Sequence, residues 1–267
     1  MPDITGAMLN VKYLDELSRQ NNFINKLHPL VKLIVTLVYI GVLASFGRYE
    51  ITGILPFILY PVIVVVMCDI PAKKLIKRII IVEPFIVFAG ILNPILDKGV
   101  ISVGQLTFSC GWLTFFSLII KSTLMVSAGF LLIATTGIDD IAGALGMVRV
   151  PSIFILLFLL TYRYIFVLMD EAGRLQKAYT LRAPQQRGVK IQVWGTMVGQ
   201  LLIRTYNRAQ TIYQSMVLKG YNGRYNIGTG RAFRYADTAY LTVCIVFAAA
   251  ARMINIPLMI ASLVSRF

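Results

Sequence analysis

Long apolar stretches constrain this chain more than any other feature of its sequence. Four of them lie in the first half, at residues 30–46, 51–67, 79–96 and 112–136. About 20 apolar residues in a helix cross the hydrocarbon of a bilayer and satisfy their own backbone hydrogen bonds. Each stretch therefore predicts a transmembrane helix, and the third, which contains Pro84 and Pro94, predicts a kinked one.

The composition indicates that lipid is the solvent for most of the chain. Hydrophobic residues make up 57% and charged residues only 14%, with a mean hydropathy of +0.74. The formal net charge is nevertheless +14. Basic residues beside apolar stretches normally face the cytoplasm and its anionic headgroups, so the charge does not predict a nucleic-acid partner.

The distribution of cations predicts the orientation in the inner membrane. Residues 71–78 contain four Lys or Arg. The segment after the third stretch, in contrast, has only two charged residues, Asp97 and Lys98. The positive-inside rule places the N-terminus and residues 69–78 in the cytoplasm and residues 97–111 outside. Weak alternation in this outer segment predicts a short hairpin. The polar N-terminus lacks the residue order of a secretory signal, so the first stretch is expected to be a retained span.

The second half predicts long helices that leave the membrane. Residues 137–147 form an amphipathic pattern, capped by Asp139, that suits a helix on the inner membrane surface. Two helices of about 30 residues follow, 152–182 and 190–219, each apolar first and polar later. Residues 170–234 carry eleven Lys or Arg against two acids, which indicates a basic cytoplasmic projection.

The predicted fold is an all-α polytopic membrane protein with five to six transmembrane helices. Residues 1–136 form an N-terminal membrane region, 137–234 a cytoplasmic region and 235–267 a C-terminal membrane segment. Arg252 and Pro257 interrupt the last apolar stretch, 237–265, so it crosses once or crosses and makes a short return.

The chain lacks the motifs of several catalytic and metal-binding classes. It has no P-loop, so any ATP that drives it is expected to bind another subunit. Its one histidine, His28, and three widely spaced cysteines predict neither a metal site nor a cofactor. Asp139 and Asp140 are better explained by helix capping than by a Mg²⁺-diphosphate site. Glu83 and Lys121 lie in apolar stretches, and we expect each to reach an interface rather than to serve in transport.

The two long helices end alike. Residues 178–183 align without gaps on 215–220, each ending in a leucine, a cation and a small residue. A cation in a last turn also favours the helix dipole, but a duplicated exposed pattern favours docking to a dimeric partner with two acidic grooves. The predicted docking residues are Leu181, Arg182, Ala183, Leu218, Lys219 and Gly220.

Other polar residues on these helices have simpler roles. Arg163, between two tyrosines, is expected to anchor its helix at the membrane interface. Asp170 and Arg174 stand at i,i+4 with the acid first, the favourable order for a pair within one helix.

Several separate motifs resemble one family. They are the Leu-His-Pro-Leu-Val-Lys-Leu run at 27–33, the segment 161–171 with its Tyr-Arg-Tyr and Asp170-Glu171, the paired helix ends, and Gly220-Tyr221-Asn-Gly-Arg after the second helix. Together they resemble the transmembrane T component of energy-coupling factor (ECF) transporters, and within it the CbiQ type of the cobalt and nickel importers. The resemblance covers nearly the whole chain.

The resemblance implies a scaffold without catalytic activity. Such a subunit joins a membrane substrate-binding subunit to two ABC-type ATPases, and its two coupling helices each end in Ala-Arg-Gly, whose arginine docks in an ATPase groove. The matching cations here are Arg182 and Lys219, with Arg163, Asp170, Glu171, Arg174 and Tyr221 in supporting positions. This chain departs from the pattern with Leu-Arg-Ala and Leu-Lys-Gly, and a lysine cannot form the forked bond of arginine to a carboxylate.

Three alternatives stay open at this point. A T component shared by several vitamin-binding subunits would have the same architecture with different cargo. An integral membrane enzyme for lipid or prenyl substrates would need clustered acids, and a channel or secondary transporter would need polar residues through several spans. The chain has only twelve acids and nearly featureless spans, which argues against the last two.

Overall fold

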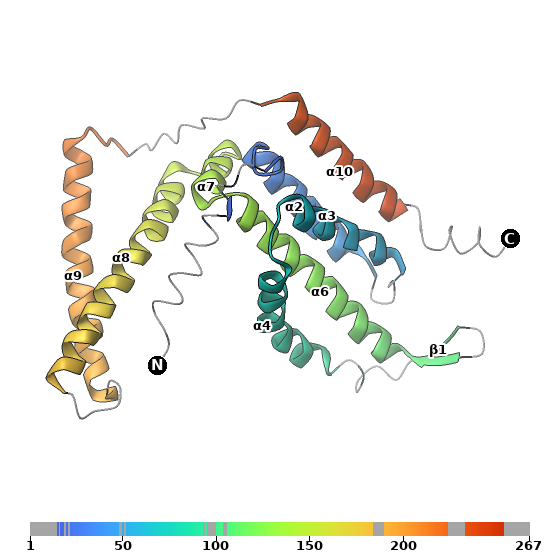
Figure 1. Ribbon diagram of the computed structural model, residues 1–267, viewed down its shortest axis with the longest axis horizontal. Coiled ribbons are helices and arrows are strands. Elements are labelled where there is room, and N and C mark those ends of the chain that lie inside the picture. The colour runs from blue at the N-terminus through green and yellow to red at the C-terminus, as the bar shows by residue number, and fades with distance from the viewer. Residues whose placement is uncertain are drawn as a thin grey trace. The chain divides into compact units, whose positions relative to one another are not determined.

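The computed structural model describes residues 15, 17, 18, 20, 22–47, 50, 52–92, 94, 100–103, 106–183, 190–223 and 233–253. The chain divides into two compact units. Unit 1 consists of Met1–Glu16 and Ile138–Thr229, and unit 2 of Leu17–Gly137 and Gly230–Phe267. Figure 1 labels the elements of both.

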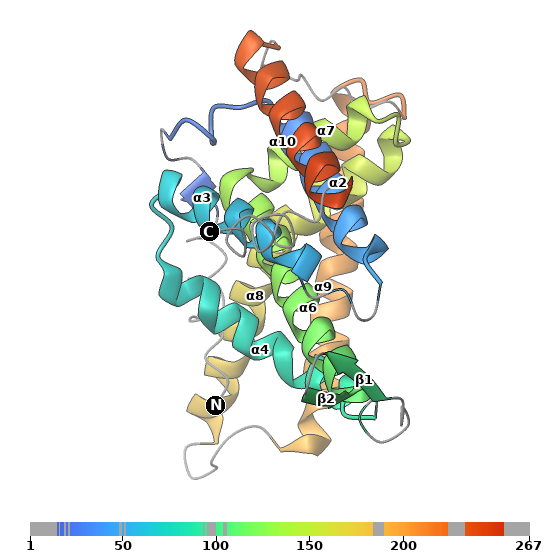
Figure 2. The ribbon, with the colours of Figure 1, turned by 90° about the vertical axis from the view of Figure 1, so that its right-hand side faces the viewer.

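Unit 2 is a helical bundle with one small hairpin. Its elements are α2 (Pro29–Ser45), the 3₁₀ helix η1 (Thr52–Ile58), α3 (Leu59–Met67), α4 (Ala72–Gly90), β1 (Val100–Val103), β2 (Leu106–Ser109), α6 (Cys110–Thr135) and α10 (Tyr235–Met253). Helix α2 packs against α6 and α10, and α4 packs along α6 (Figures 1 and 2).

Local sequence explains where α2 begins. His28 is the N-cap, and its ring nitrogen Nδ1 accepts the Leu30 N–H at 3.3 Å. Pro29 follows at the first helical position, where its missing N–H costs nothing and its fixed φ suits the helix. Further along, the buried Tyr39 hydroxyl donates to the Phe57 carbonyl at 2.9 Å, which ties α2 to η1 in the core.

Two predicted spans differ from their expected form. The stretch 51–67 is not one α-helix, because its first half, with Pro56 inside, forms the 3₁₀ helix η1 before α3 begins. Proline lacks an N–H and disturbs the regular α ladder. The third helix, α4, begins at Ala72, seven residues before the apolar stretch, and so includes the four cations. Pro84 lies inside α4, whereas Pro94 lies beyond its end.

The predicted hairpin is confirmed. Strands β1 and β2 pair in antiparallel fashion, with Val100 opposite Ser109 and Val103 opposite Leu106. This hairpin leads directly into α6, at the opposite end of that helix from Thr135.

Unit 1 contains α7 (Ile138–Met147), α8 (Ser152–Arg182) and α9 (Ile191–Leu218), close to the predicted bounds. One detail is corrected: α7 begins before Asp139, so Asp139 and Asp140 lie in its first turn rather than at its cap. Acids in a first turn still stabilise the positive end of the helix dipole.

The prediction of an all-α membrane protein is confirmed. Among the described residues, Gly111–Thr135 and Ser152–Arg182 are long and apolar enough to cross a bilayer, and Pro29–Ser45 and Gly53–Met67 are shorter apolar helices. Large apolar side chains on α4 face outward, such as Phe85 and Phe88, each 79% exposed. The number of crossings stays a prediction, and the possible return after Met253 lies outside the described residues.

Candidate functional site

Helices α8 and α9 cross near their middles. Glu171 of α8 forms an ion pair with Arg204 of α9. The Arg208 guanidinium, one turn further along α9, lies 5.5 Å from the centre of the Tyr164 ring on α8. The earlier residue of α8, Tyr164, thus contacts the later residue of α9, Arg208. The two helices therefore run in opposite directions, as Figure 1 also shows. We call this antiparallel pair, residues 152–218, the arm.

Arg182 is the last helical residue of α8. Its neighbour Leu181 is 82% exposed, and Arg182 is exposed as well. Ala183 follows as the C-cap with φ −131° and ψ 65°, and its N–H donates to the Tyr179 carbonyl at 3.0 Å. Because this φ is negative, the first arm end does not need a glycine at the small-residue position.

The second arm end is built differently, by a Schellman motif. The Tyr221 N–H donates to the Met216 carbonyl and the Gly220 N–H to the Val217 carbonyl, each at 2.9 Å. Gly220 has φ +86°, a left-handed conformation that side chains disfavour. Lys219 is therefore the C-cap, one residue beyond the helix, next to Leu218, which is 88% exposed.

The two predicted docking cations lie at opposite ends of the arm. Arg182 ends α8 beside the start of α9, whereas Lys219 lies at the far end of α9, whose 28 residues span about 42 Å at 1.5 Å per residue. Both leucine-cation ends are exposed within the described part of the chain. The arrangement therefore suits two separate contacts rather than one shared site.

The supporting residues are only partly as expected. Arg163, Asp170 and Arg174 are exposed, and the described contacts contain no ion pair between Asp170 and Arg174. The acid that forms an ion pair in this region is Glu171, and its partner comes from the other helix. Tyr221 contributes its backbone N–H to the helix cap.

Sequence reasoning missed Arg204 and Arg208. The signal was present in the polar half of α9, where these cations stand four residues apart on one face, at the spacing that brings both to a single partner helix.

Glu83 and Lys121 serve the packing of unit 2. The Lys121 ammonium donates to the Phe46 and Gly47 carbonyls at 2.9 and 2.8 Å and so satisfies the end of α2. The Glu83 carboxylate accepts a hydrogen bond from Thr123 of α6, and its position at an interface stays a prediction.

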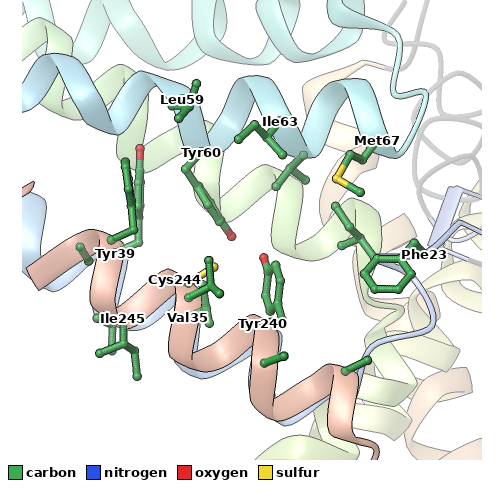
Figure 3. Close-up of a pocket in the computed structure, with 18 residues that line it drawn as sticks. Phe23, Val35, Tyr39, Leu59, Tyr60, Ile63, Met67, Tyr240, Cys244 and Ile245 are labelled. Atoms are coloured by element: carbon green, nitrogen blue, oxygen red, sulfur yellow. The ribbon is translucent and has the colours of Figure 1, made fainter. Parts of the chain in front are cut away.

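Unit 2 also contains an apolar cavity of about 550 Å³ between α2, α3 and α10. Figure 3 shows the Tyr60 and Tyr240 hydroxyls pointing toward each other inside it. Its other lining residues are apolar apart from Tyr39 and Cys244. A divalent transition metal needs several N, O or S ligands, and the described residues contain no group of three or more His, Cys, Asp or Glu side chains placed to hold one.

Comparison with known proteins identifies the family. The family model CbiQ, described as cobalt transport protein, matches residues 20–228. An uncharacterized protein of Methanocaldococcus jannaschii is 23% identical over 90% of this chain and 87% of its own length. The energy-coupling factor transporter transmembrane protein EcfT of Ruminiclostridium cellulolyticum is 26% identical over 76% of this chain and 81% of its own.

A third relative is the nickel permease LarQ of Lactiplantibacillus plantarum, which is 26% identical over 50% of this chain and 48% of its own length. The family match covers α2, the helices through α6 and the whole arm, whereas α10 lies beyond it. The family model matches more than half of the chain, so the chain belongs to the CbiQ cobalt transport protein family, a family of transporter membrane components.

Proposed function

We propose that this chain is the non-catalytic transmembrane scaffold of an ATP-driven ECF-type importer. It joins two ABC-type ATPase subunits to a separate membrane substrate-binding subunit that carries cobalt or nickel ions. The observation that carries the proposal is the arm, which presents an exposed leucine and cation at the end of each of its two helices, of which α9 alone is about 42 Å long. Two well-separated cationic ends match a dimer that offers one acidic groove per subunit.

The ion pair and the cation–π contact explain how the arm would transmit force. Glu171, Arg204, Tyr164 and Arg208 fasten the two helices at their crossing. When ATP binding brings the two ATPase grooves together, these contacts let α8 and α9 rotate as one rigid body instead of bending separately. The chain then acts as a lever, and the chemistry of ATP hydrolysis stays in the partner subunits.

The proposal includes a membrane topology. Residues 1–136 and 235–267 form the multi-pass membrane region in the inner membrane. The N-terminus and residues 137–234 lie on its cytoplasmic side, with the apolar first half of α8 against the membrane up to the interfacial Arg163. The cation-rich start of α4 supports this orientation. Single cysteines placed at Lys73 and Lys98 are expected to react with a membrane-impermeant maleimide from the inside and the outside, respectively.

The relatives' names favour metal cargo over the alternative. One relative is called a nickel permease and the matching family a cobalt transport protein, whereas EcfT is named only as an energy-coupling factor component. A T component shared among vitamin-binding subunits stays the second candidate. Radioactive Co²⁺ or Ni²⁺ uptake by cells that express the chain with its neighbouring subunits distinguishes the two.

Co-purification tests the docking ends directly. The tagged wild type and an Arg182→Glu/Lys219→Glu double variant are purified in mild detergent with the neighbouring ATPases. We expect the wild type to retain the ATPases and the double variant to lose them, since two acids would face acidic grooves. Lys73→Glu is the matched control, because it reverses an exposed charge of α4, outside the arm.

Two results would contradict the proposal. Equal retention by the wild type and the double variant would reduce Arg182 and Lys219 to ordinary helix ends. A wild type that retains no ATPase would contradict the scaffold assignment itself.

Lys219→Arg is a gain-of-function check on ATPase retention, because arginine's fork binds a carboxylate better than lysine's ammonium.

A further inference from the structure

The chain passes from unit 2 into unit 1, which contains α7 and the arm, and back at two places. It leaves after Gly137, just beyond the end of α6, and returns at Gly230, just before α10. The last turn of α6 and the first turn of α10 are therefore the two roots of the arm. Both roots belong to unit 2, and both contact the first turn of α2.

Lys32 holds the first root. Its side chain is buried, with 3% of its surface exposed, and its ammonium donates to the Thr135 carbonyl at 2.8 Å. That carbonyl lies in the last turn of α6, where backbone oxygens lack partners within the helix and the helix dipole favours a cation. A charge-assisted bond of this kind fixes the end of α6, after which the chain enters α7 and then the arm.

Asp237 holds the second root. It is 2% exposed, and its two carboxylate oxygens accept different backbone N–H groups: Oδ2 that of Arg234 at 2.8 Å, and Oδ1 that of His28 at 2.7 Å. The first bond caps α10 and the second joins α10 to the N-cap of α2. The His28 ring also stacks on Phe233, with centroids 4.1 Å apart.

We propose that the first turn of α2, His28 to Lys32, is a clamp that fixes both roots of the arm, and that Lys32 and Asp237 are positioning residues for force transmission. One turn of one helix holds the exit from α6 and the entry into α10. A movement of the arm is then transmitted to the membrane helices through these two fixed roots. Without the clamp, local flexibility at the roots would absorb that movement. The transmission part rests on the proposed function, whereas the clamp itself does not.

Distance measurements between spin labels test the clamp without any partner. Labels at Lys73 in unit 2 and Gln214 in the arm report on the roots, and labels at Lys177 and Gln214 report on the arm alone; all three positions are exposed. We expect Lys32→Met to broaden the first distance distribution about twofold and to leave the second unchanged, because a lost hydrogen bond to a charged group loosens one root.

Lys121→Met is the matched control. It removes a lysine-to-carbonyl contact of the same kind, from the other end of the same helix α2, far from either root. Asp237→Asn is the second test variant, because an amide nitrogen cannot accept the N–H that one carboxylate oxygen now accepts. The clamp would be overturned if the Lys73–Gln214 distance distribution of both test variants were as narrow as that of the wild type. It would also be overturned if Lys121→Met broadened this distribution as much as the test variants do.

Transport by the reconstituted complex tests the positioning role. We expect Lys32→Met and Asp237→Asn to retain the ATPases and their ATP turnover but to lower metal uptake per ATP hydrolysed by about tenfold, the change that a lost charged hydrogen bond makes in an equilibrium. Lys121→Met is expected to keep the wild-type ratio. An unchanged ratio in the test variants, in a wild-type complex that assembles and transports, would overturn the positioning role alone; a wild type that binds no ATPase would instead refute the proposed function.

Discussion

The crossing of α8 and α9 can be tested by exchanging the charges of its ion pair. Glu171→Lys and Arg204→Glu each place like charges at the contact, and the double variant restores an ion pair with its polarity reversed. Both side chains are in unit 1, so the result does not depend on any partner subunit.

The structure sets the expected magnitude. The Arg204 side chain is 55% exposed and that of Glu171 is 24% exposed, and only one guanidinium nitrogen makes the contact. Solvent therefore screens the pair, and its contribution is in the upper part of the range for surface ion pairs, about 0.5–1 kcal/mol. Each single reversal is expected to destabilise by about that amount or slightly more, and the exchange to recover most of it.

The assay is a double-mutant cycle on unfolding in mixed micelles, at low salt and at 0.5 M salt. We expect a coupling energy of about 0.5–1 kcal/mol that shrinks in high salt, since screening weakens exposed pairs. Asp170→Lys combined with Arg204→Glu is the control cycle, because Asp170 is adjacent in sequence but is not the partner in the ion pair. A coupling energy within about 0.3 kcal/mol of zero for the Glu171 cycle would refute the crossing geometry.

Further predictions follow from three single residues, Gly220, Cys68 and Gly90. Gly220→Ala is expected to destabilise the second arm end by about 1 kcal/mol and to weaken ATPase retention, because its φ is +86°, whereas Ala183→Gly at the other end leaves retention unchanged. Burial raises the pKa of the Cys68 thiol to about 11, so maleimide labelling of native protein at pH 7 is expected to be slow and to quicken as the pH rises toward that value. The raised pKa means that the folded state favours the protonated Cys68 thiol, which stabilises the fold at neutral pH; this contribution is lost as the pH rises above the thiol's ordinary pKa. In thermal unfolding, a Cys68→Ser variant is therefore expected to lose less stability than the wild type between pH 8 and pH 11. Gly90→Val is expected to lower the free energy of unfolding by about 1–3 kcal/mol, because even a Cβ there meets two α6 side chains at 3.0 Å. Gly129→Ala, with open space around its Cβ, is expected to be neutral or stabilising. Equal effects of the two substitutions would contradict the α4–α6 packing.

The sequence by itself determined the elements that depend on local periodicity and chain breaks. The bounds of α8 match the prediction because an apolar run, a polar run and Pro184 mark them without help from neighbours. The two arm ends were likewise visible as a repeated pattern. Composition alone indicated a membrane protein, since too few polar residues exist to cover a soluble fold of this length.

Only the tertiary structure decided which distant residues meet. Asp170 and Arg174 satisfied the i,i+4 rule, but Glu171 faces α9 and forms an ion pair with Arg204, 33 residues later. Likewise, the Glu83 carboxylate of α4 accepts a hydrogen bond from Thr123 of α6, 40 residues later.

The same holds for the first turn of α2, where Asp237 reaches His28 across 209 residues of sequence. Such contacts depend on how helices pack, and a sequence pattern records the face a residue occupies but not the partner that comes to lie against it.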